Sequence, residues 1–413
     1  MREILARLAR FADERGSAAV AALVVLALAF GLAYAVYLGD QAPYIDEVDY
    51  LAIATNLATK QFFSGDGQHP NAWRAPVYPL LLGGLVRLGV PTWGLRLLNF
   101  TALALAVWLI AAIARRQSTA LGGLLAAALI FAYPVLFYAA GRFFPQTLAG
   151  LLLVLLVYLM GRARSAFAFA GAGLVYGALV LTVPVFMFHA WVLAGWLLLV
   201  HGWTGLRWSL LVMASASLVV AVWVVRNYLV FGVALVTTAS GGTLLWGNSP
   251  YATIGGADVE FLFRYYAEAA KLGEVESNAY YTAEALRYIR ENKLEALGFY
   301  LLKVANHFNF YNEHFLSSEG STLRTLVMLV TYGPLLLLLI VRLLQWRRFP
   351  LGPVELLLAV LYVSAAFVYA IFHTRIRYRV PFDYLLLTMV GMYLDRFLRT
   401  WLDRDERAAP RSR

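Results

Sequence analysis

The chain has 413 residues, of which 61% are hydrophobic and 14% charged, with a formal net charge of +10 and no cysteine. Soluble domains carry about 25% charged residues, so the polar residues here could not cover a soluble core of this size, and the composition predicts a membrane protein. The lack of cysteine excludes disulfides, thiolate metal sites and cysteine nucleophiles. The basic residues punctuate apolar runs rather than forming one stripe, which argues against nucleic acid as the partner.

Apolar runs long enough to cross a bilayer recur along the chain, since a transmembrane helix needs about 20 apolar residues. The first run, 18–38, is too long for a cleavable signal peptide and lacks a convincing cleavage site, so we interpret it as a retained span. About ten spans are predicted, near 18–38, 92–114, 118–139, 144–161, 165–183, 185–201, 208–230, 322–341, 353–372 and 380–394. Only Pro184 divides two of them, so the number of helices between 165 and 201 stays open. The predicted fold is an all-α integral membrane bundle, a single domain over 1–413 with amphipathic helices in its outer loops.

The basic residues also predict the orientation of the bundle. Short loops rich in Arg and Lys all fall on one side, at 115–116, 162–164, 207, 342–348 and in the tail 396–413. The positive-inside rule makes that side cytoplasmic, so both termini are expected in the cytoplasm, with the protein in the inner or plasma membrane. A first outer loop, 39–91, a large outer loop, 231–321, and the short segment 373–379 then face outward.

The first outer loop packs ionisable residues between two long apolar segments, namely Asp46, Glu47, Asp49, His69 and Arg74. Apolar residues at helical spacing from Val48 to Ala58 predict an amphipathic helix along the membrane surface, with Asp46 at its start. A second short helix is predicted to begin near Pro76.

Asp46 is the sharpest candidate for acid–base chemistry. It follows the first span directly, at the membrane face, where a carboxylate could accept the proton of a reacting hydroxyl. Glu47 and Asp49 are weaker candidates, and Asp49 could orient Asp46 because it lies three residues further along the same helix. The alternative is that these carboxylates only cap the helix and complement its dipole.

Arginines occur on the outer side, where topology alone disfavours them, at Arg74, Arg142, Arg226, Arg375, Arg377 and Arg379. Arg74 stands between two prolines and offers a planar fork for a phosphate, although an interfacial arginine reaching toward headgroups would look the same. Arg226 ends the seventh span, where an arginine is common for structural reasons. Arg375, Arg377 and Arg379 repel one another unless an anion relieves them, so they predict a phosphate contact or, alternatively, contacts to lipid headgroups.

His69 and Gln146 are candidates for supporting roles. A lone histidine without companions at ligand spacing is more often neither ligand nor base, so no metal site is predicted. Gln146 stands at the outer start of the fourth span and is neutral.

The large outer loop begins with a Gly-rich stretch, S-G-G-T-L-L-W-G-N-S-P, which predicts a turn region. Periodic segments rich in Tyr and Phe follow near 257–271, 279–291 and 293–309.

With these residues in hand, the chain resembles the GT-C superfamily of polyprenyl-phosphate-sugar-dependent transferases, such as the protein O-mannosyltransferases and the lipid A aminoarabinose transferases. The resemblance covers most of the chain and lies in motifs that occur in order. These are I-D-E-V-D-Y-L-A-I-A, then W-R-A-P-V-Y-P-L-L-L, then V-W-V-V-R-N-Y-L-V-F-G with G-G-T-L-L-W-G-N-S-P, and finally R-Y-R-V-P-F-D.

This resemblance implies a glycosyltransferase that moves a sugar from a polyprenyl-phosphate donor to an acceptor on the extracytoplasmic face, with inversion. Asp46 would serve as general base or acceptor organiser, with Glu47 as its support. Arg74 would contact the lipid phosphate. The residues implied around the phosphate or the sugar are Arg226, Arg377 and Tyr378.

Two departures from the family pattern matter. Gln146 stands where many relatives have an acidic residue, and Val183 interrupts a T-R-P-like pattern. The first weakens the case for a two-carboxylate mechanism or a carboxylate-bound metal, although a divalent cation stays open as a cofactor.

Two other classes stay open besides the enzyme. A transporter or flippase for a lipid-linked sugar usually places ionisable residues near the bilayer midplane, whereas the predicted span centres here are nearly free of charge. A catalytically silent membrane partner is the third reading, suggested by Gln146. The sugar, the acceptor (lipid, glycan or protein) and the oligomeric state are not predicted by the sequence.

Overall fold

The computed structural model describes residues 2–311 and 321–408, so 312–320 of the predicted large outer loop and 409–413 of the predicted tail lie outside the described residues. Up to the large outer loop the helices are α1 (Arg2–Leu38), α2 (Ile45–Lys60), α3 (Val77–Arg87), α4 (Thr92–Leu95), α5 (Leu97–Gln117), α6 (Ala120–Phe131), α7 (Val135–Ala140), α8 (Gln146–Met160), α9 (Ala166–Val180), the 3₁₀ helix η1 (Pro184–His189), α10 (Ala190–His201) and α11 (Thr204–Phe231). Beyond it they are α12 (Ala239–Trp246), α13 (Val259–Phe261), the π-helix η2 (Leu262–Tyr266), α14 (Ala267–Ala269), α15 (Glu274–Glu291), α16 (Lys293–His307), α17 (Thr322–Leu344), α18 (Pro353–Ala370) and α19 (Ile376–Ala408). Strands β1 (Ala252–Thr253) and β2 (Gly256–Ala257) form a short antiparallel hairpin.

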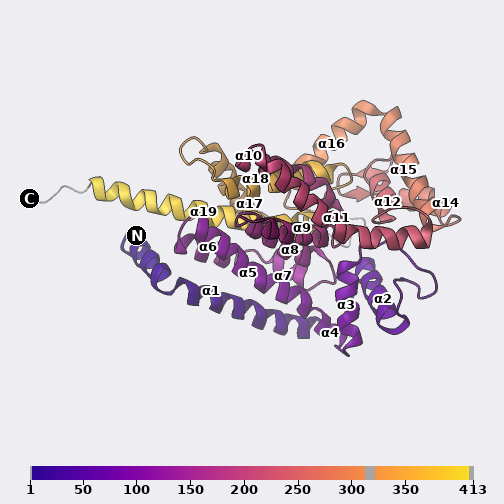
Figure 1. Ribbon diagram of the computed structural model, residues 1–413, viewed down its shortest axis with the longest axis horizontal. Helices are drawn as coiled ribbons and strands as arrows, with labels where there is room; N and C mark the ends of the chain where they lie inside the picture. The colour runs from indigo at the N-terminus through magenta and orange to yellow at the C-terminus, as the bar shows by residue number, and fades with distance from the viewer. Residues whose placement is uncertain (1, 312–320, 409–413) are drawn as a thin grey trace, which may run out of the picture.

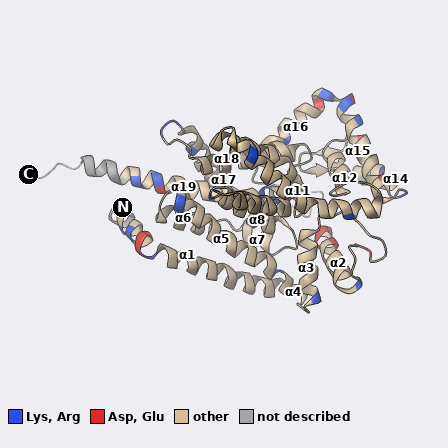
Figure 2. Cartoon of the chain, in the orientation of Figure 1, with Lys and Arg blue, Asp and Glu red and all other residues tan. Residues whose placement is uncertain are grey.

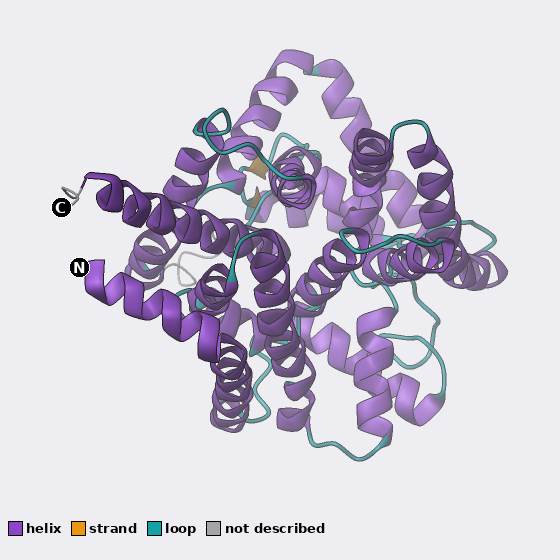
Figure 3. Ribbon diagram, turned by 60° about the vertical axis from the view of Figure 1, so that its left-hand side comes forward, coloured by secondary structure: helices purple, strands orange, loops and turns teal. Residues whose placement is uncertain are grey.

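The long helices run roughly along one axis, and both termini lie at the same end of the molecule (Figure 1). The helices of the two predicted outer loops, among them α2, α3, α12 and α15, lie toward the other end. Long stretches of the helices between carry no charged residue (Figure 2), and the β1–β2 hairpin is a small feature within a helical molecule (Figure 3). This is the all-α membrane architecture that the sequence predicts.

Helices of the described residues coincide with every predicted span. The helices long and apolar enough to cross a membrane are Ala6–Leu38, Thr92–Gln117, Pro184–His201, Thr204–Phe231, Thr322–Leu344 and Pro353–Ala370. The span predicted at 118–139 is divided into α6 and α7 at Pro134, because proline cannot continue a helix. Likewise α9 ends at Val180, and a second helical segment, made of η1 and α10 in succession, begins at Pro184, so two helical segments occupy 165–201.

The core lies around α19, which packs against α5, α6, α8 and α18. By contrast, α1, α11 and α17 bury only a minority of their apolar side chains, as helices that face lipid would. The packing of α9 on α11 depends on two small residues one turn apart. A Cβ at Gly173 or Gly177 would overlap the backbone of Val212 or Ala216, so glycine lets these helices approach closely.

In the first outer loop, α2 and α3 pack against each other, and the start of α2 carries the acidic residues of interest. The pattern Val48 to Ala58 locates α2 correctly, but Val48 is exposed, and Tyr50 and Ala54 form the side packed against α3. The reason is Gly83 of α3, which allows the backbone of Ala54 to approach within contact distance. Ile53 is also buried, in a cluster with Phe63, Leu181 and Trp223. The pair therefore rests on the bundle through one face and leaves a second apolar face outward.

The large outer loop contains the helical segments predicted from periodicity, now seen as α13–α14, α15 and α16. The Gly-rich stretch before them is partly helical, since α12 spans Ala239–Trp246 where a turn region is predicted. Gly241 explains the difference, because α12 packs so closely on α15 that a Cβ there would overlap the Asn278 carbonyl.

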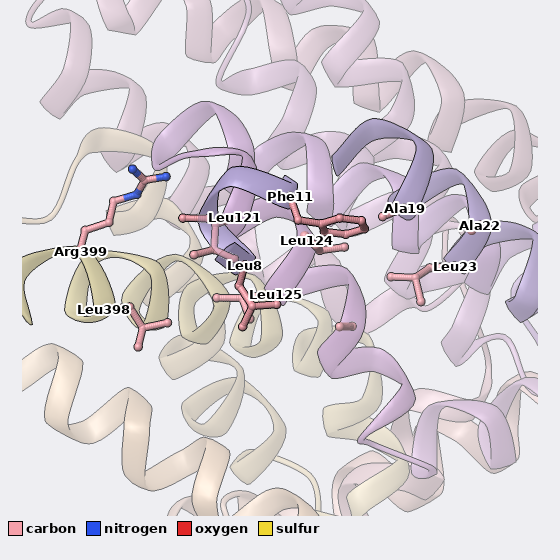
Figure 4. A pocket seen from close by; sticks show the side chains of 12 residues that line it. Leu8, Phe11, Ala19, Ala22, Leu23, Leu121, Leu124, Leu125, Leu398 and Arg399 are labelled. Atoms are coloured by element: carbon pink, nitrogen blue, oxygen red, sulfur yellow. The ribbon is translucent and has the colours of Figure 1, made fainter. Parts of the chain in front are cut away.

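An apolar cavity of about 540 Å³ lies between α1, α6 and α19, at the end of the molecule where both termini lie (Figure 4). Leucines such as Leu8, Leu124 and Leu398 line it, with Arg399 at one side. It lies far from the charged residues of the first outer loop.

Candidate functional site

A cluster of ion pairs joins the first outer loop to the start of the last helix. One oxygen of Asp46 lies 2.6 Å from Nη2 of Arg74, and the other lies 2.5 Å from Nη1 of Arg377, a residue 331 positions further along the chain. Asp49 accepts a second hydrogen bond from Nη2 of Arg74, at 2.7 Å. The α2 carboxylates at positions 46 and 49 thus converge on one guanidinium, and Asp46 bridges two.

The electrostatics of this cluster favour an ionised Asp46. Burial alone would raise the pKa of Asp46, but the positive charges and hydrogen bonds of Arg377 and Arg74 outweigh it and hold the pKa well below its usual range. Desolvation lowers the pKa of both arginines, but the neighbouring tyrosine (Tyr50 for Arg74, Tyr378 for Arg377) and Asp46 outweigh it and raise the pKa above the ordinary value. Asp46 and both arginines are therefore charged across the physiological pH range.

Aromatic residues and a histidine position Arg377. Its Nη2 donates to the Tyr378 hydroxyl at 3.3 Å, and that hydroxyl also lies 3.0 Å from Nε2 of His373. The guanidinium packs 5.0 Å from the ring of Phe144, just before α8. The Arg377 guanidinium thus contacts aromatic side chains where it pairs with Asp46.

Arg74 is held by the loop on which it sits. Its guanidinium packs over the Tyr50 ring, at 5.1 Å. The residues before it are bonded to the large outer loop, where the Thr238 amide donates to Ala72 and the Thr237 hydroxyl to the Trp73 carbonyl. Contacts from both outer loops therefore fix the position of Arg74.

Glu47 points the other way, into the bundle, and is fully buried. It accepts a hydrogen bond from the Phe143 amide at 2.9 Å and another from the Tyr44 amide at 3.3 Å, and lies 3.9 Å from Nη1 of the buried Arg96. Arg96 donates in turn to the carbonyls of Gly39, Gln41 and Gly141. These bonds connect the start of α2 to the segment before α8, on the interior side of Asp46.

The remaining candidate residues lie outside the ion-pair cluster. Arg226, at the end of α11, donates to the Asn71 carbonyl at 2.8 Å and packs over Trp223, so it supports the Arg74 loop from below. His69 lies on an exposed turn, 2.8 Å from Asp66. Gln146 begins α8 and is buried, and its Oε1 has no hydrogen-bond partner among the described residues.

The three arginines before the last span do not share one side. Arg375 precedes α19 and donates to the Gly255 carbonyl beside the hairpin, while Arg377 reaches Asp46. Arg379 points into the bundle, where it pairs with Asp383 at 3.1 Å and packs 3.5 Å from the Tyr332 ring centre. An extended chain would align them, but helix α19 begins at Ile376 and sends successive residues in different directions.

Sequence reasoning missed Arg96, Asp383 and Lys303, which are all fully buried. Arg96 and Asp383 lie within or beside apolar runs, and an ionisable residue in such a position is itself a signal of a buried partner. Lys303 lies on an amphipathic helix, where the sequence offers no sign of burial. Among the described residues, no group of three His, Asp or Glu side chains is placed to hold a metal ion.

The fold and the cluster together define a polytopic helical membrane protein with a charged site at one end. No protein-family model matches the chain, and no curated protein sequence matches it either. Among solved structures, ArnT from Cupriavidus metallidurans bound to undecaprenyl phosphate is similar to this chain, with a TM-score of 0.50 and 16% identity over 90% of the chain. The apo state of ArnT is also found, with a TM-score of 0.40, 15% identity and 89% of the chain covered, and 77% of that structure.

This similarity concerns the fold, and the fold of this chain is GT-C-like. The chain spans 60% of the length of the undecaprenyl-phosphate-bound structure.

Proposed function

We propose that the protein is a membrane glycosyltransferase that takes its sugar from a polyprenyl-phosphate donor. The observation that carries the proposal is the Asp46 bridge between Arg74 and Arg377, which combines a candidate base with two candidate phosphate ligands at the end of a GT-C-like bundle. The similar fold of a protein that binds undecaprenyl phosphate supports this donor class.

The ion pairs also restrict the mechanism. A carboxylate whose pKa is held far below its usual range is a poor proton acceptor, so Asp46 in its resting pairs is a weak base. A donor phosphate competes for the same guanidinium groups. We infer that the phosphate replaces Asp46 on Arg377 or Arg74 and that this exchange raises the pKa of Asp46 toward its ordinary value, so that donor binding prepares the base.

The transfer step forms one glycosidic bond and breaks one bond to phosphate. The acceptor oxygen attacks the anomeric carbon and forms the new glycosidic bond, while its proton passes to Asp46. The bond between the anomeric carbon and the phosphate oxygen breaks, and the electron pair leaves with the polyprenyl phosphate. The arginines stabilise the charge that grows on that oxygen, which is usually the larger contribution to catalysis.

Four of the remaining candidates have supporting roles in this proposal. Tyr378 orients Arg377, and Glu47 supports the start of α2 from beneath. Asp49 keeps Arg74 in place when Asp46 is released. Arg226 supports the Arg74 loop. The proposal leaves Arg375, His69 and Gln146 outside direct contact with the phosphate, and it places the site on the extracytoplasmic face with both termini in the cytoplasm.

A flippase for a lipid-linked sugar is the competing function. A flippase would also need arginines to bind the phosphate of the lipid-linked sugar, but it would not need a carboxylate that competes with that phosphate. Incubation of the purified protein with polyprenyl-phosphate sugars and candidate acceptors separates the two. Release of polyprenyl phosphate supports the transferase, whereas movement of intact donor between leaflets without cleavage contradicts it.

A further inference from the structure

Lys303, on α16 of the large outer loop, is fully buried. A lysine is almost never fully buried unless it is paired, yet no carboxylate lies within ion-pair distance of it among the described residues. Burial lowers the pKa of Lys303 to about 8. Burying this charge without a carboxylate partner costs free energy, so the other contacts of the amine must offset that cost.

The ammonium group donates to three acceptors from two separate segments. Nζ lies 2.8 Å from the Gly247 carbonyl, 3.2 Å from Oδ1 of Asn248 and 2.8 Å from the Phe372 carbonyl. An ammonium has three protons, so this geometry satisfies all of them. Lys303 therefore joins the end of α12 to the turn between α18 and α19.

Neighbouring bonds tie down the same turn, residues 371–374. Asn248 donates to the Ile371 carbonyl at 2.8 Å, and Asn306 donates to Thr374 at its carbonyl and its hydroxyl oxygen. Gly247 packs on this turn so closely that a Cβ would overlap the Phe372 carbonyl. Contacts from the large outer loop thus hold this turn in place.

This turn leads directly to the ion-pair cluster. His373 lies 3.0 Å from the Tyr378 hydroxyl, which accepts a hydrogen bond from Arg377. Arg377 follows Phe372 by five residues and reaches Asp46 at 2.5 Å. A continuous set of contacts thus runs from α16 through the turn to the site.

We propose that Lys303 is a positioning residue: by holding the 371–374 turn, it sets the position of Arg377 against Asp46. The effect on donor binding rests on the proposed function, whereas the effect on the turn does not.

Three variants test this proposal. Lys303→Met keeps the length of the side chain and removes all three donors, and Lys303→Arg keeps the charge and several donors. Lys293→Met, at the exposed start of the same helix, is the matched control. Hydrogen exchange is measured across the full-length protein in detergent. Lys303→Met is expected to accelerate exchange at 371–378 about tenfold, with α18 unchanged, Lys303→Arg intermediate and Lys293→Met like the wild type.

Exchange at 371–378 equal to the wild type in Lys303→Met overturns the proposal. Exchange accelerated evenly through all helices also overturns it, because that result indicates a general loss of stability rather than control of the turn.

The route through Arg377 has its own readout, the dissociation constant for undecaprenyl phosphate. Lys303→Met is expected to weaken binding about tenfold, and to add little in an Arg377→Ala background, because residues that act through one another are not additive. An equal loss in both backgrounds contradicts the route. If undecaprenyl phosphate fails to bind even the wild type, the proposed function fails, and the exchange result alone upholds or overturns the control of the turn by Lys303.

Discussion

Asp46 and Glu47 are adjacent in sequence but do different work, because neighbouring residues on a helix point about 100° apart. Asp46 faces two arginines from distant segments, whereas Glu47 faces the interior and a backbone amide. The sequence ranks Asp46 above Glu47 by its position at the membrane face, but it does not show where either side chain points. Burial and the direction of each side chain separate a group that could contact substrate from one that supports the loop.

Glu47→Gln is expected to lower stability more than activity. Glutamine keeps an acceptor for the Phe143 amide, but it leaves the charge of Arg96 unpaired in the interior. Breaking a buried pair costs about 3–5 kcal/mol, and the retained hydrogen bond should keep the loss near the lower figure. Thermal unfolding in detergent measures it, with Asp66→Asn on the exposed turn as control. Abolished transfer with unchanged unfolding would instead assign Glu47 a direct role.

At the scale of elements, hydrophobic periodicity locates the helices, because each must present apolar residues to lipid or to its neighbours. It fails at α12, where two adjacent glycines suggest a turn and only the close contact with α15 explains the helix. Hydrophobic periodicity also does not predict the directions of Arg375, Arg377 and Arg379, because these depend on where α19 begins. The contact between Asp46 and Arg377 joins segments 331 residues apart, and no local pattern encodes it.

The tether from α16 to the α18–α19 turn predicts a dependence of stability on alkaline pH. The ordinary pKa of lysine is 10.5, and burial lowers the pKa of Lys303 to about 8. Between these values the unfolded chain binds a proton that the folded one does not, so stability rises with pH, by up to about 3 kcal/mol. His373, Arg375 and Arg377 are the charged or titratable groups nearby, and burial keeps the pKa of His373 well below its usual range, so it stays neutral here.

Unfolding of the wild type and of Lys303→Met, followed from pH 8 to 10, checks this dependence. The wild type should gain stability relative to the variant as the pH rises. If the stabilities of the wild type and of Lys303→Met change with pH in parallel, Lys303 keeps its ordinary pKa, and another group offsets the cost of burying its charge.

At the scale of the whole molecule, both termini lie at one end and α2, which carries Asp46, lies toward the other (Figure 1). Composition alone indicates the membrane class, and the basic loops predict which end is cytoplasmic. The orientation therefore needs a measurement of its own.

The absence of cysteine makes that measurement direct, since any introduced cysteine is the single thiol. Thr59→Cys lies on the exposed end of α2, and Arg164→Cys lies on the exposed loop between α8 and α9. A membrane-impermeant maleimide should label the first in intact cells and the second only after permeabilisation. The reverse labelling would place the site on the cytoplasmic face.

The exchange of Asp46 for a donor phosphate on the arginines is tested most directly by measuring two properties of Asp46→Asn, transfer and affinity for undecaprenyl phosphate. Transfer should fall by about 100-fold or more because the base is lost. Affinity should rise above that of the wild type, because the internal competitor for Arg74 and Arg377 has lost its charge, whereas Arg377→Lys should bind more weakly. Near-normal turnover in Asp46→Asn, or an affinity that falls together with that of Arg377→Lys, would contradict the assignment.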